Sequence, residues 1–368
     1  MVDNTKMNFL FSCGGTGGHI YPALAIAKEL KERYPQARFL FVGATGRMEM
    51  QRVPQEGFPI VGLPISGFQG KGLLHKLLFP FKVLRSLYKA RQILKDFRPD
   101  AVIGTGGYAS APTLKVAQWM GYPVFVQEQN SYAGMANKWV ARGAQKVFVA
   151  YSHMERYFPH TPLLLTGNPV RKDLITLEPP TADLYQAWGL TPDKFTLLVL
   201  GGSLGARRIN ELIATHLPLL RERGIQLLWQ CGQYYYEDYK HLAGEGVVIR
   251  PYIDQMSDAY RLASVILSRA GASSVSELAL VGKPVIFVPS PNVAEDHQTK
   301  NAQAIASQGA AILLPEAQGN ERFASLICQL QEDAQLREEL AQHFKALARP
   351  QATQQIADAV IATLAPAP

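Results

Sequence analysis

Short apolar runs alternate with amphipathic segments along most of the chain. In the first half the apolar runs lie at residues 8–13, 39–42, 60–63, 102–103, 124–127, 147–149 and 163–165. In the second half they lie at residues 195–200, 227–230, 247–249, 264–268, 285–288 and 311–314. Strands that are buried on both faces read as continuous apolar runs, and helices connect them in parallel βα units. The pattern therefore predicts two α/β domains, each built on a parallel sheet.

The alternation is interrupted once, at residues 166–169, and restarts at Phe195. Gly167 and Pro169 stand in this interruption, and the residue before a proline is biased away from helix. We therefore expect a first domain at residues 1–168 and a second at residues 169–349. A chain of 368 residues suits two domains of this size. The tail reads as helices that break at Pro350.

Four glycine-rich turns follow the first and the fourth apolar run of each half. They lie at residues 14–19, 104–108, 201–206 and 269–277, each before a segment with helical spacing. A strand, a glycine turn and a helix start form an anion site, because free N–H groups and the helix dipole point at one place. Ligands of open α/β sheets bind beyond the carboxyl ends of the strands, so we expect both pairs of turns to face one cleft between the domains.

Composition excludes several classes of protein. The apolar fraction of 47% and the charged fraction of 18% are those of a soluble globular protein, and no apolar run is long enough to span a membrane. The amino terminus lacks a signal-peptide cleavage pattern, so we expect the chain to stay in the cytoplasm. Its three cysteines are scattered without metal-ligand spacing, which fits a reducing compartment and no zinc site.

The net charge of +7 is distributed unevenly. Residues 1–170 carry 20 Lys and Arg against 9 Asp and Glu, whereas residues 171–368 carry 17 against 21. Eight of the cations lie between Lys71 and Arg98, with Asp96 as the one opposing charge. This excess indicates an anionic partner for the first half. Nucleic acid is the poorer candidate, because no nucleic-acid-binding motif accompanies the charge.

Residues 73–88 combine large apolar side chains with regularly spaced cations. In one interpretation the apolar face packs on the sheet and the cations are solvated. In the other, Leu77, Leu78, Phe79 and Phe81 enter a lipid surface while the cations meet anionic headgroups. Trp119 would extend such a membrane patch.

Several polar side chains near the glycine turns are candidates for chemistry. His19 suits a general base, since the histidine pKa of about 6.5 allows proton abstraction near neutral pH, although it could equally cap or pack a helix. Arg171 suits a departing diphosphate but would also suit a surface ion pair. Glu277 could accept hydrogen bonds from ribose hydroxyls or be solvated, and Gln298 could bind sugar hydroxyls or reflect helix capping.

The ordered set of motifs resembles the MurG family of N-acetylglucosaminyltransferases from about Asn8 to Ala302. The matching segments are GGTGGH (14–19), VGATGRME (42–49), ISG (65–67) with GKG (70–72), GTGGYAS (104–110), QEQN (127–130), GNPVR (167–171), GGSLGA (201–206), YID (252–254), RAGASSVSE (269–277) and HQTKNA (297–302). As an ordered set they are far more specific than any one glycine motif.

The resemblance implies a GT-B fold of two facing Rossmann-like domains with a cleft between them, and a C-terminal helix at residues 350–368 that returns to the first domain. It implies transfer of N-acetylglucosamine from UDP-N-acetylglucosamine to undecaprenyl-diphospho-muramoyl-pentapeptide in peptidoglycan synthesis, and through it a part in cell shape and division. The second domain would hold the UDP-sugar. The first would receive the acceptor at the cytoplasmic face of the plasma membrane, as a peripheral protein.

Motif by motif, the resemblance also implies site residues. The donor would be held by Arg171, Ser203, Ile253, Ala272, Ser273, Ser274, Val275, Ser276, Glu277 and Gln298. Contacts from the first domain, to donor or acceptor, would come from Thr16, Gly17, Gly18 and Asn130. The acceptor diphosphate would lie at Gly14, Gly15, Gly106 and Gly107. The membrane patch would comprise Leu77, Phe79, Phe81, Lys82, Arg85 and Trp119.

The family reaction inverts the anomeric centre, which implies a single displacement by the acceptor 4-hydroxyl as UDP leaves. His19 is then the preferred base and Glu128 the second candidate. Arg171 and the turn at residues 201–203 would neutralise the leaving diphosphate. The chain has no paired-aspartate motif at either glycine region, and we expect neither an obligatory metal nor a cofactor.

Three alternatives remain at this point. A transferase that glycosylates diacylglycerol would share the fold, the UDP site and the membrane patch. An NAD-dependent oxidoreductase is suggested by GGTGGH but opposed by the absence of a ribose-binding carboxylate at residues 36–39. A nucleotide-sugar sensor without catalytic activity is the third.

Overall fold

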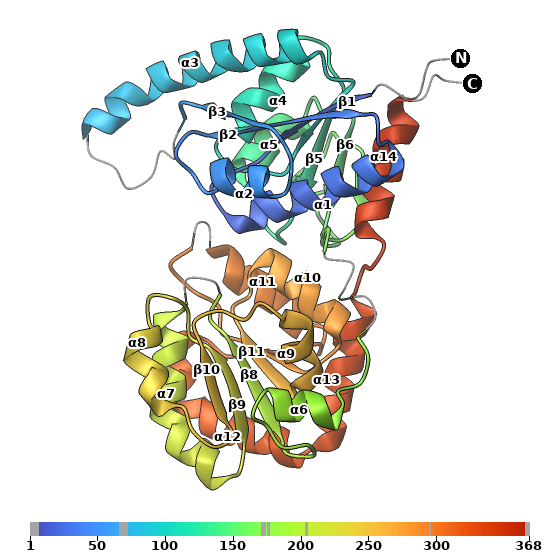
Figure 1. Ribbon diagram of the computed structural model, residues 1–368. Helices are drawn as coiled ribbons and strands as arrows, with labels where there is room; N and C mark the ends of the chain where they lie inside the picture. Colours follow the sequence, from blue (N-terminus) through green and yellow to red (C-terminus); the bar gives the residue numbers. More distant parts are fainter. Residues whose placement is uncertain are drawn as a thin grey trace. The chain divides into compact units, whose positions relative to one another are not determined.

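The chain divides into two compact units. The first comprises residues 1–170 together with 349–368, and the second comprises residues 171–348. The computed structural model describes residues 7–65, 73–170, 174, 177–202, 205–293 and 296–364, with the backbone alone for residues 73–79. In Figure 1 the first unit runs from blue to green and ends with the red helix α14.

The first unit contains a seven-stranded parallel sheet in the order β3-β2-β1-β4-β5-β6-β7. The strands are β1 (Asn8–Ser12), β2 (Arg38–Ala44), β3 (Ile60–Leu63), β4 (Ala101–Gly104), β5 (Val124–Glu128), β6 (Lys146–Val149) and β7 (Leu163–Leu165). Its helices are α1 (Gly17–Arg33), α2 (Glu49–Gln55), α3 (Leu73–Phe97), α4 (Ser110–Trp119), α5 (Met135–Ala141) and α14 (Ala352–Leu364).

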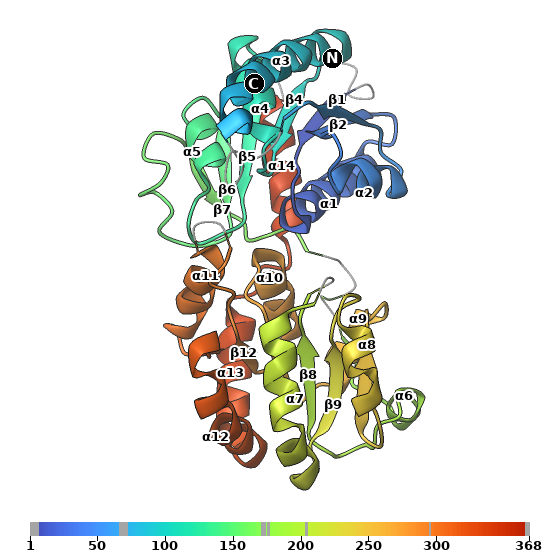
Figure 2. The ribbon, with the colours of Figure 1, turned by 90° about the vertical axis from the view of Figure 1, so that its left-hand side faces the viewer.

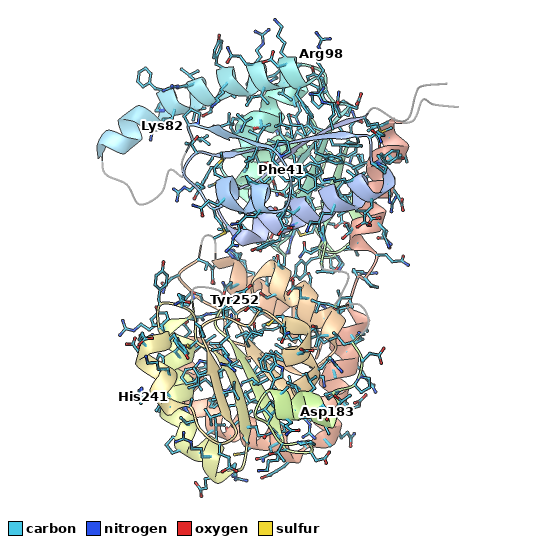
Figure 3. The ribbon with its side chains drawn as sticks, in the orientation of Figure 1. Phe41, Lys82, Arg98, Asp183, His241 and Tyr252 are labelled. Carbon is cyan, nitrogen blue, oxygen red and sulfur yellow. The ribbon has the colours of Figure 1, made fainter. Side chains whose placement is uncertain are left out.

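Helices cover both faces of this sheet, which is why its strands are mostly apolar. On one face the phenylalanines of the strands pack against α1 and α14; Phe9, Phe11 and Phe41 are fully buried there. On the other face smaller residues such as Leu10 and Val102 pack against α3, α4 and α5. The side chains alternate between the faces because successive strand residues point in opposite directions. Figure 3 shows Phe41 inside this unit.

The second unit contains a six-stranded parallel sheet in the order β10-β9-β8-β11-β12-β13. The strands are β8 (Thr196–Leu200), β9 (Gln226–Gln230), β10 (Val247–Arg250), β11 (Val265–Ser268), β12 (Val285–Phe287) and β13 (Ile312–Leu313). The helices are α6 (Ala182–Ala187), α7 (Arg207–Glu222), α8 (Tyr236–Tyr239), α9 (Met256–Leu262), α10 (Ala272–Val281), α11 (His297–Ala306), α12 (Gly319–Glu332) and α13 (Ala334–Ala346). Two short 3₁₀ helices are η2 (Lys240–Leu242) and η4 (Glu316–Gln318). Figure 2 shows α7, α12 and α13 along this sheet.

The core of the second unit packs around one large side chain. Trp229 is fully buried on β9, and its indole N–H donates to the amide oxygen of Asn210 on α7 at 3.0 Å. The Asn210 amide nitrogen in turn donates to the Cys231 carbonyl at 2.8 Å. A buried indole N–H needs such a partner, since an unsatisfied donor there would destabilise the fold.

Both sheets reverse their strand order at the strand that begins the unit. β1 pairs with β2 on one side and β4 on the other, and β8 pairs with β9 and β11 in the same way. β1 and β4 are neighbours in the first sheet, and β8 and β11 are neighbours in the second. Each of these four strands is followed by a glycine turn. The predicted strands and the position of the turns after strands one and four are thus confirmed. This is the place where open α/β sheets bind ligands.

Candidate functional site

The two glycine turns of the first unit touch each other through their backbones. A Cβ atom on Gly107 would lie 2.1 Å from the carbonyl oxygen of Gly14, and Gly107 has a φ of +91°. Neither the contact nor the backbone angle suits a residue with a side chain. The turn after β1 and the turn after β4 therefore form one continuous backbone surface at the end of the sheet.

His19 lies in the first turn of α1, above this surface. Its Nδ1 is 3.0 Å from the Gly14 carbonyl oxygen and 3.3 Å from the Thr16 hydroxyl. A carbonyl oxygen can only accept, so Nδ1 carries the hydrogen and, in the neutral ring, Nε2 carries the lone pair. The Thr105 hydroxyl also donates to the His19 carbonyl at 2.6 Å. The imidazole is therefore held with Nε2 as its acceptor nitrogen.

Thr16, Gly17 and Gly18 form the amino-terminal end of α1. Thr16 is exposed and is the N-cap residue, with extended backbone. The first turn of a helix has N–H groups without acceptors in the helix, and no acidic residue stands in the first turn of α1. This end of α1 can therefore donate to an anionic or hydroxyl group of a ligand.

Glu49, to which sequence reasoning gave no role, lies beneath the first turn. Its side chain is fully buried, and it accepts hydrogen bonds from the N–H groups of Gly15 at 3.0 Å and Ala44 at 2.9 Å. Gly15 is one of the four glycines expected at the acceptor diphosphate. While its N–H donates to Glu49, that N–H points into the protein. The only indication of a role for Glu49 in the sequence is that it belongs to VGATGRME (42–49), one of the segments that resemble the MurG family.

Glu128 ends β5 in a buried polar network. Its side chain is 1% exposed; one oxygen accepts from the backbone N–H and side-chain amide of Asn130, the other from Gly134 N–H and the Asn137 amide. Burial raises the pKa of the Glu128 carboxyl, and these four donors oppose the rise. The carboxylate thus holds the loop that carries Asn130.

Two further amides of the QEQN motif are also buried. Gln127 donates to Asn168 at 2.8 Å, and Gln129 donates to the Thr105 carbonyl at 2.7 Å. Asn168 in turn donates to the Gln129 carbonyl at 3.0 Å. These bonds connect the loop after β5 with the turn after β4 and with the GNP segment.

In the second unit the turn after β8 is braced by Gln230, which sequence reasoning also missed. The Gln230 amide nitrogen donates to the Gly202 carbonyl at 3.1 Å, and its amide oxygen accepts from Ile253 N–H at 3.0 Å. Gln230 thus joins the glycine turn to the YID segment that contains Ile253. Arg171 and Ser203, expected at the donor diphosphate, lie outside the residues that the structure describes.

The motif RAGASSVSE occupies the end of β11 and the start of α10. Gly271 is the N-cap, and residues 272–277 form the first turns of the helix, with no acidic residue in the first of them. Ala272 and Val275 are buried, whereas Ser273, Ser274, Ser276 and Glu277 are partly exposed. The Ser273 hydroxyl oxygen is nevertheless buried, and the Ser276 hydroxyl donates to the Ala272 carbonyl at 3.2 Å. The side chains that a ligand at this helix start can reach are therefore those of Ser274, Ser276 and Glu277.

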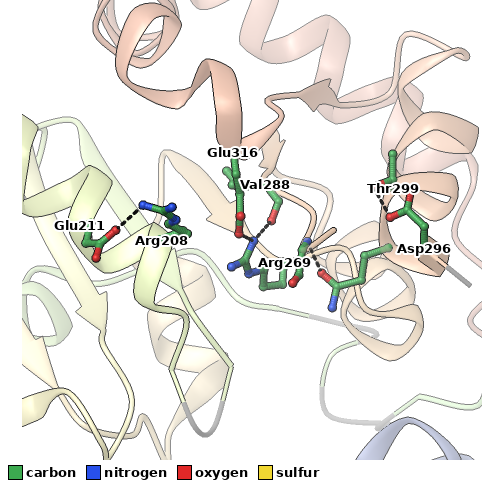
Figure 4. Close-up of polar contacts among 9 residues, drawn as sticks. Arg208, Glu211, Arg269, Val288, Asp296, Thr299 and Glu316 are labelled. Carbon is green, nitrogen blue, oxygen red and sulfur yellow. Dashed lines mark hydrogen bonds and ion pairs between the residues drawn. The ribbon is translucent and has the colours of Figure 1, made fainter. Parts of the chain in front are cut away.

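Arg269 opens the same motif but is fully engaged within the protein. Its guanidinium donates to the Val288 carbonyl at 2.9 Å and lies 2.5 Å from the Glu316 carboxylate, as Figure 4 shows. Both partners of this ion pair are largely buried. Arg269 therefore ties together the ends of β11 and β12 and the 3₁₀ helix η4.

Gln298 lies in the first turn of α11. Its amide oxygen accepts from Ser290 N–H at 2.9 Å, which places the amide nitrogen on the opposite side of the group. The preceding N-cap, Asp296, has a left-handed φ of +50° and accepts from the Thr299 hydroxyl at 2.7 Å (Figure 4). Gln298 is thereby oriented with a donor available for a sugar hydroxyl.

The structure describes the side chains of only some residues of the predicted membrane patch. Leu77 and Phe79 lie in α3, at positions where the structure gives the backbone alone. Farther along α3, Phe81, Leu84 and Tyr88 are 64–69% exposed, and their spacing places them on one side of the helix. The remaining members of the predicted patch are Lys82, which is partly exposed and labelled in Figure 3, and the exposed Arg85 and Trp119.

Within residues 7–65, 73–170, 174, 177–202, 205–293 and 296–364, no group of three His, Cys, Asp or Glu side chains could hold a metal ion. None of the described helices is both long and apolar enough to cross a membrane.

Comparison with known proteins assigns both units. Residues 9–149 match the glycosyltransferase family 28 N-terminal domain, and residues 196–359 match the C-terminal domain of the same family. The chain thus matches both domains of a family 28 glycosyltransferase.

Individual relatives identify the kind of glycosyltransferase more closely. The chain is 52% identical, over 97% of both chains, to a Flavobacterium psychrophilum protein named UDP-N-acetylglucosamine--N-acetylmuramyl-(pentapeptide) pyrophosphoryl-undecaprenol N-acetylglucosamine transferase. A protein of the same name from Christiangramia forsetii is 48% identical over 96% of this chain and 97% of its own. The crystal structure of Acinetobacter baumannii MurG superposes with a TM-score of 0.77 at 30% identity, covering 97% of this chain and 99% of that one. The chain belongs to the MurG family, which confirms the predicted family and fold class.

Gly106 generates a prediction about His19. A Cβ atom at Gly106 would lie 2.8 Å from Cδ2 and 3.0 Å from Nε2 of His19. Gly106→Ala should therefore displace the imidazole. With His19 as the predicted base, the transferase turnover number should fall about 10-fold or more, since a misplaced catalytic group costs up to about 100-fold.

Gly46→Ala is the matched control. Gly46 also has a positive φ, of +74°, but apart from its two chain neighbours no described residue comes within 4 Å of the place that a Cβ atom would take there. Both variants should lose about 1–3 kcal/mol of stability from backbone strain, measured by thermal unfolding. Equal turnover in the two variants would show that the Gly106 contact does not control His19.

Proposed function

We propose that the protein transfers N-acetylglucosamine from UDP-N-acetylglucosamine to the 4-hydroxyl of the muramoyl sugar in undecaprenyl-diphospho-muramoyl-pentapeptide. The observation that carries this proposal is the match, over 97% of both chains, to a relative named for that transfer. As a member of this family the protein is a hexosyltransferase. Its product would be the disaccharide precursor of peptidoglycan.

The reaction would be a single displacement. The acceptor oxygen forms a bond to C1 of N-acetylglucosamine as the bond from C1 to the diphosphate breaks, and the configuration at C1 inverts. Nε2 of His19 takes the hydroxyl proton; the bond from Nδ1 to the Gly14 carbonyl supports this role, because it leaves Nε2 as the acceptor. The imidazolium formed in this step keeps its Nδ1 hydrogen bond to Gly14.

The leaving UDP carries the electron pair of the broken bond away as negative charge. Arg171, Ser203 and the turn at Gly201 and Gly202 would stabilise this charge in the second unit. Ile253, the partly exposed residues of 272–277 and Gln298 would hold the rest of the donor. Support comes from the brace by Gln230 and from the orientation of the Gln298 amide.

In the first unit, Thr16, Gly17, Gly18 and Asn130 would contact the sugars. The acceptor diphosphate would lie against the surface formed by Gly14, Gly106 and Gly107 and against the start of α1. Because Gly15 N–H is bonded to Glu49, the diphosphate would use the remaining donors of these turns.

The buried state of Glu49 also argues against the oxidoreductase alternative. In a dinucleotide fold a carboxylate after the second strand binds the ribose of NAD. Glu49 follows β2, but both of its oxygens accept backbone N–H groups and its side chain is fully buried. It therefore has no oxygen to offer a ribose.

The first unit would also dock on the membrane that contains the acceptor. The exposed residues Phe81, Leu84 and Tyr88, which we call the α3 stripe, would enter the lipid boundary together with Trp119. Lys82 and Arg85 would meet anionic headgroups at about 1 kcal/mol each. Not every cation of α3 serves this purpose, because Lys89 donates to the Gly62 carbonyl at 2.7 Å. Docking would occur at the cytoplasmic face of the plasma membrane.

The transfer itself is tested with labelled UDP-N-acetylglucosamine and a short-chain analogue of the lipid-linked muramoyl-pentapeptide. We expect product from this pair and none from UDP-galactose with diacylglycerol. Chromatography of the labelled product measures transfer, and its anomeric coupling constant measures inversion. Transfer to diacylglycerol alone would refute the proposal.

The base assignment predicts that His19→Ala lowers kcat about 100-fold while the affinity for UDP changes less than about twofold, because only proton transfer is lost. His160→Ala, an exposed histidine of the same unit, is the control. Steady-state kinetics and UDP titration measure the two effects. A nearly normal kcat in His19→Ala would instead favour Glu128.

The docking surface predicts that replacing all three residues of the α3 stripe with Ser weakens binding to phosphatidylglycerol vesicles about 10-fold or more, because apolar burial is lost. Transfer to a water-soluble acceptor should stay within about twofold of the unmodified protein. Tyr234→Ser removes an equally exposed aromatic residue from the second unit and should leave vesicle binding unchanged. Cosedimentation measures binding, and unchanged binding of the triple variant would contradict the docking proposal.

A further inference from the structure

Glu49 is a buried carboxylate that the proposed reaction does not use. It is the first residue of α2, and its side chain has no exposed surface. Burying a charged group is costly unless it is paired or hydrogen-bonded. Among the described residues no cation pairs with Glu49, and two backbone N–H groups, those of Gly15 and Ala44, satisfy one oxygen each.

The surrounding backbone is shaped to admit this carboxylate. A Cβ atom on Gly14 would lie 2.2 Å from its Oε1, and one on Gly43 would lie 2.5 Å from its Cγ. Both β2 and the turn after β1 thus have glycine where Glu49 passes. Glu49 is also close enough to Cys13 for its negative charge to add to burial in raising the pKa of that thiol.

The bonds of Glu49 continue to His19 through a single peptide group. Glu49 holds the N–H of Gly15, and the carbonyl of the preceding residue, Gly14, belongs to the same peptide plane. That carbonyl accepts from Nδ1 of His19 at 3.0 Å. Fixing the N–H side of a planar peptide fixes the direction of its carbonyl, and therefore the position of the imidazole.

We propose that Glu49 is a positioning residue that holds the Gly14–Gly15 peptide so that its carbonyl orients His19 with Nε2 as the acceptor nitrogen. This inference rests on the proposed function in taking His19 as the base. Glu49 touches neither substrate in this scheme and acts through His19. The negative carboxylate is needed because both of its contacts are N–H donors, and a neutral amide can accept with only one of its two heavy atoms.

Glu49→Gln tests the proposal. Its amide nitrogen would face one of the two N–H groups, so the peptide should turn. We expect kcat to fall about 10-fold or more, with the KM for UDP-N-acetylglucosamine within about twofold. In a His19→Ala background the same substitution should change kcat less than about twofold, because residues that act as one unit are not additive. Equal losses in both backgrounds would overturn the proposal.

A second measurement does not depend on turnover. In protein labelled with ¹⁵N-histidine, the nitrogen shifts of neutral His19, identified by their loss in His19→Ala, should show Nδ1 protonated. Glu49→Gln should produce a mixture of the two tautomers. An unchanged tautomer would overturn the proposal even if activity fell. If the unmodified protein does not transfer N-acetylglucosamine but Glu49→Gln still changes the His19 tautomer, the proposed reaction fails and the positioning role of Glu49 stands.

Glu56→Gln is the matched control, since Glu56 immediately follows the same helix and forms an exposed pair with Lys28 at 2.5 Å. It should leave kcat, KM and the tautomer unchanged. If circular dichroism shows that Glu49→Gln does not fold, Glu49→Asp is used instead, because it keeps the charge on a shorter side chain. It is then measured in the same kinetic comparison with His19→Ala and by the same ¹⁵N spectra. A normal kcat and a normal tautomer in the folded Asp variant would equally overturn the proposal.

Discussion

The site of the first unit depends on a backbone contact that excludes side chains. The carbonyl of Gly14 and the Cα of Gly107 come so close that a methyl group would lie about an ångström inside normal contact distance. This contact joins the ends of β1 and β4, where the strand order reverses. His19, Thr105 and Gln129 all bond to backbone atoms of these two turns or of residues beside them. The arrangement of these polar groups thus depends on the absence of a Cβ atom at Gly107.

The two units share their strand order but stabilise their first glycine turns differently. In the first unit a buried carboxylate takes an N–H group of the turn, so part of the anion-binding capacity is already used by the protein. In the second unit a neutral amide, that of Gln230, bonds to the Gly202 carbonyl, while the N–H groups of Gly201 and Gly205 bond to the carbonyls of Gln230 and Gly202. One topology therefore yields a first turn held by a buried carboxylate and a second held by a neutral amide.

The sequence predicted the sheets well because the central strands are buried on both faces and read as continuous apolar runs, and it predicted the glycine turns because several of their positions have a positive φ that favours glycine. It did not predict Glu49 or Gln230. Each acts on a turn that lies about 30 residues away along the chain, and only the strand order brings them together. The roles of Arg171 and Ser203 stay predictions, as do those of the other site residues. Glu128 illustrates the limit: its role as the second candidate base stays a prediction, whereas the four donors through which it holds a loop could be found only in the structure.

The C-terminal helix has a consequence for synthesis of the protein. α14 covers the phenylalanine face of the first sheet with Ile356 and Val360, and Arg33 of α1 pairs with Asp358 of α14. These residues are translated only after the whole second unit. On the ribosome the first unit must therefore wait with part of its aromatic surface uncovered while the second unit is made. Chaperone binding during that interval would be expected at the α1 side of the sheet, where the missing helix leaves apolar surface exposed.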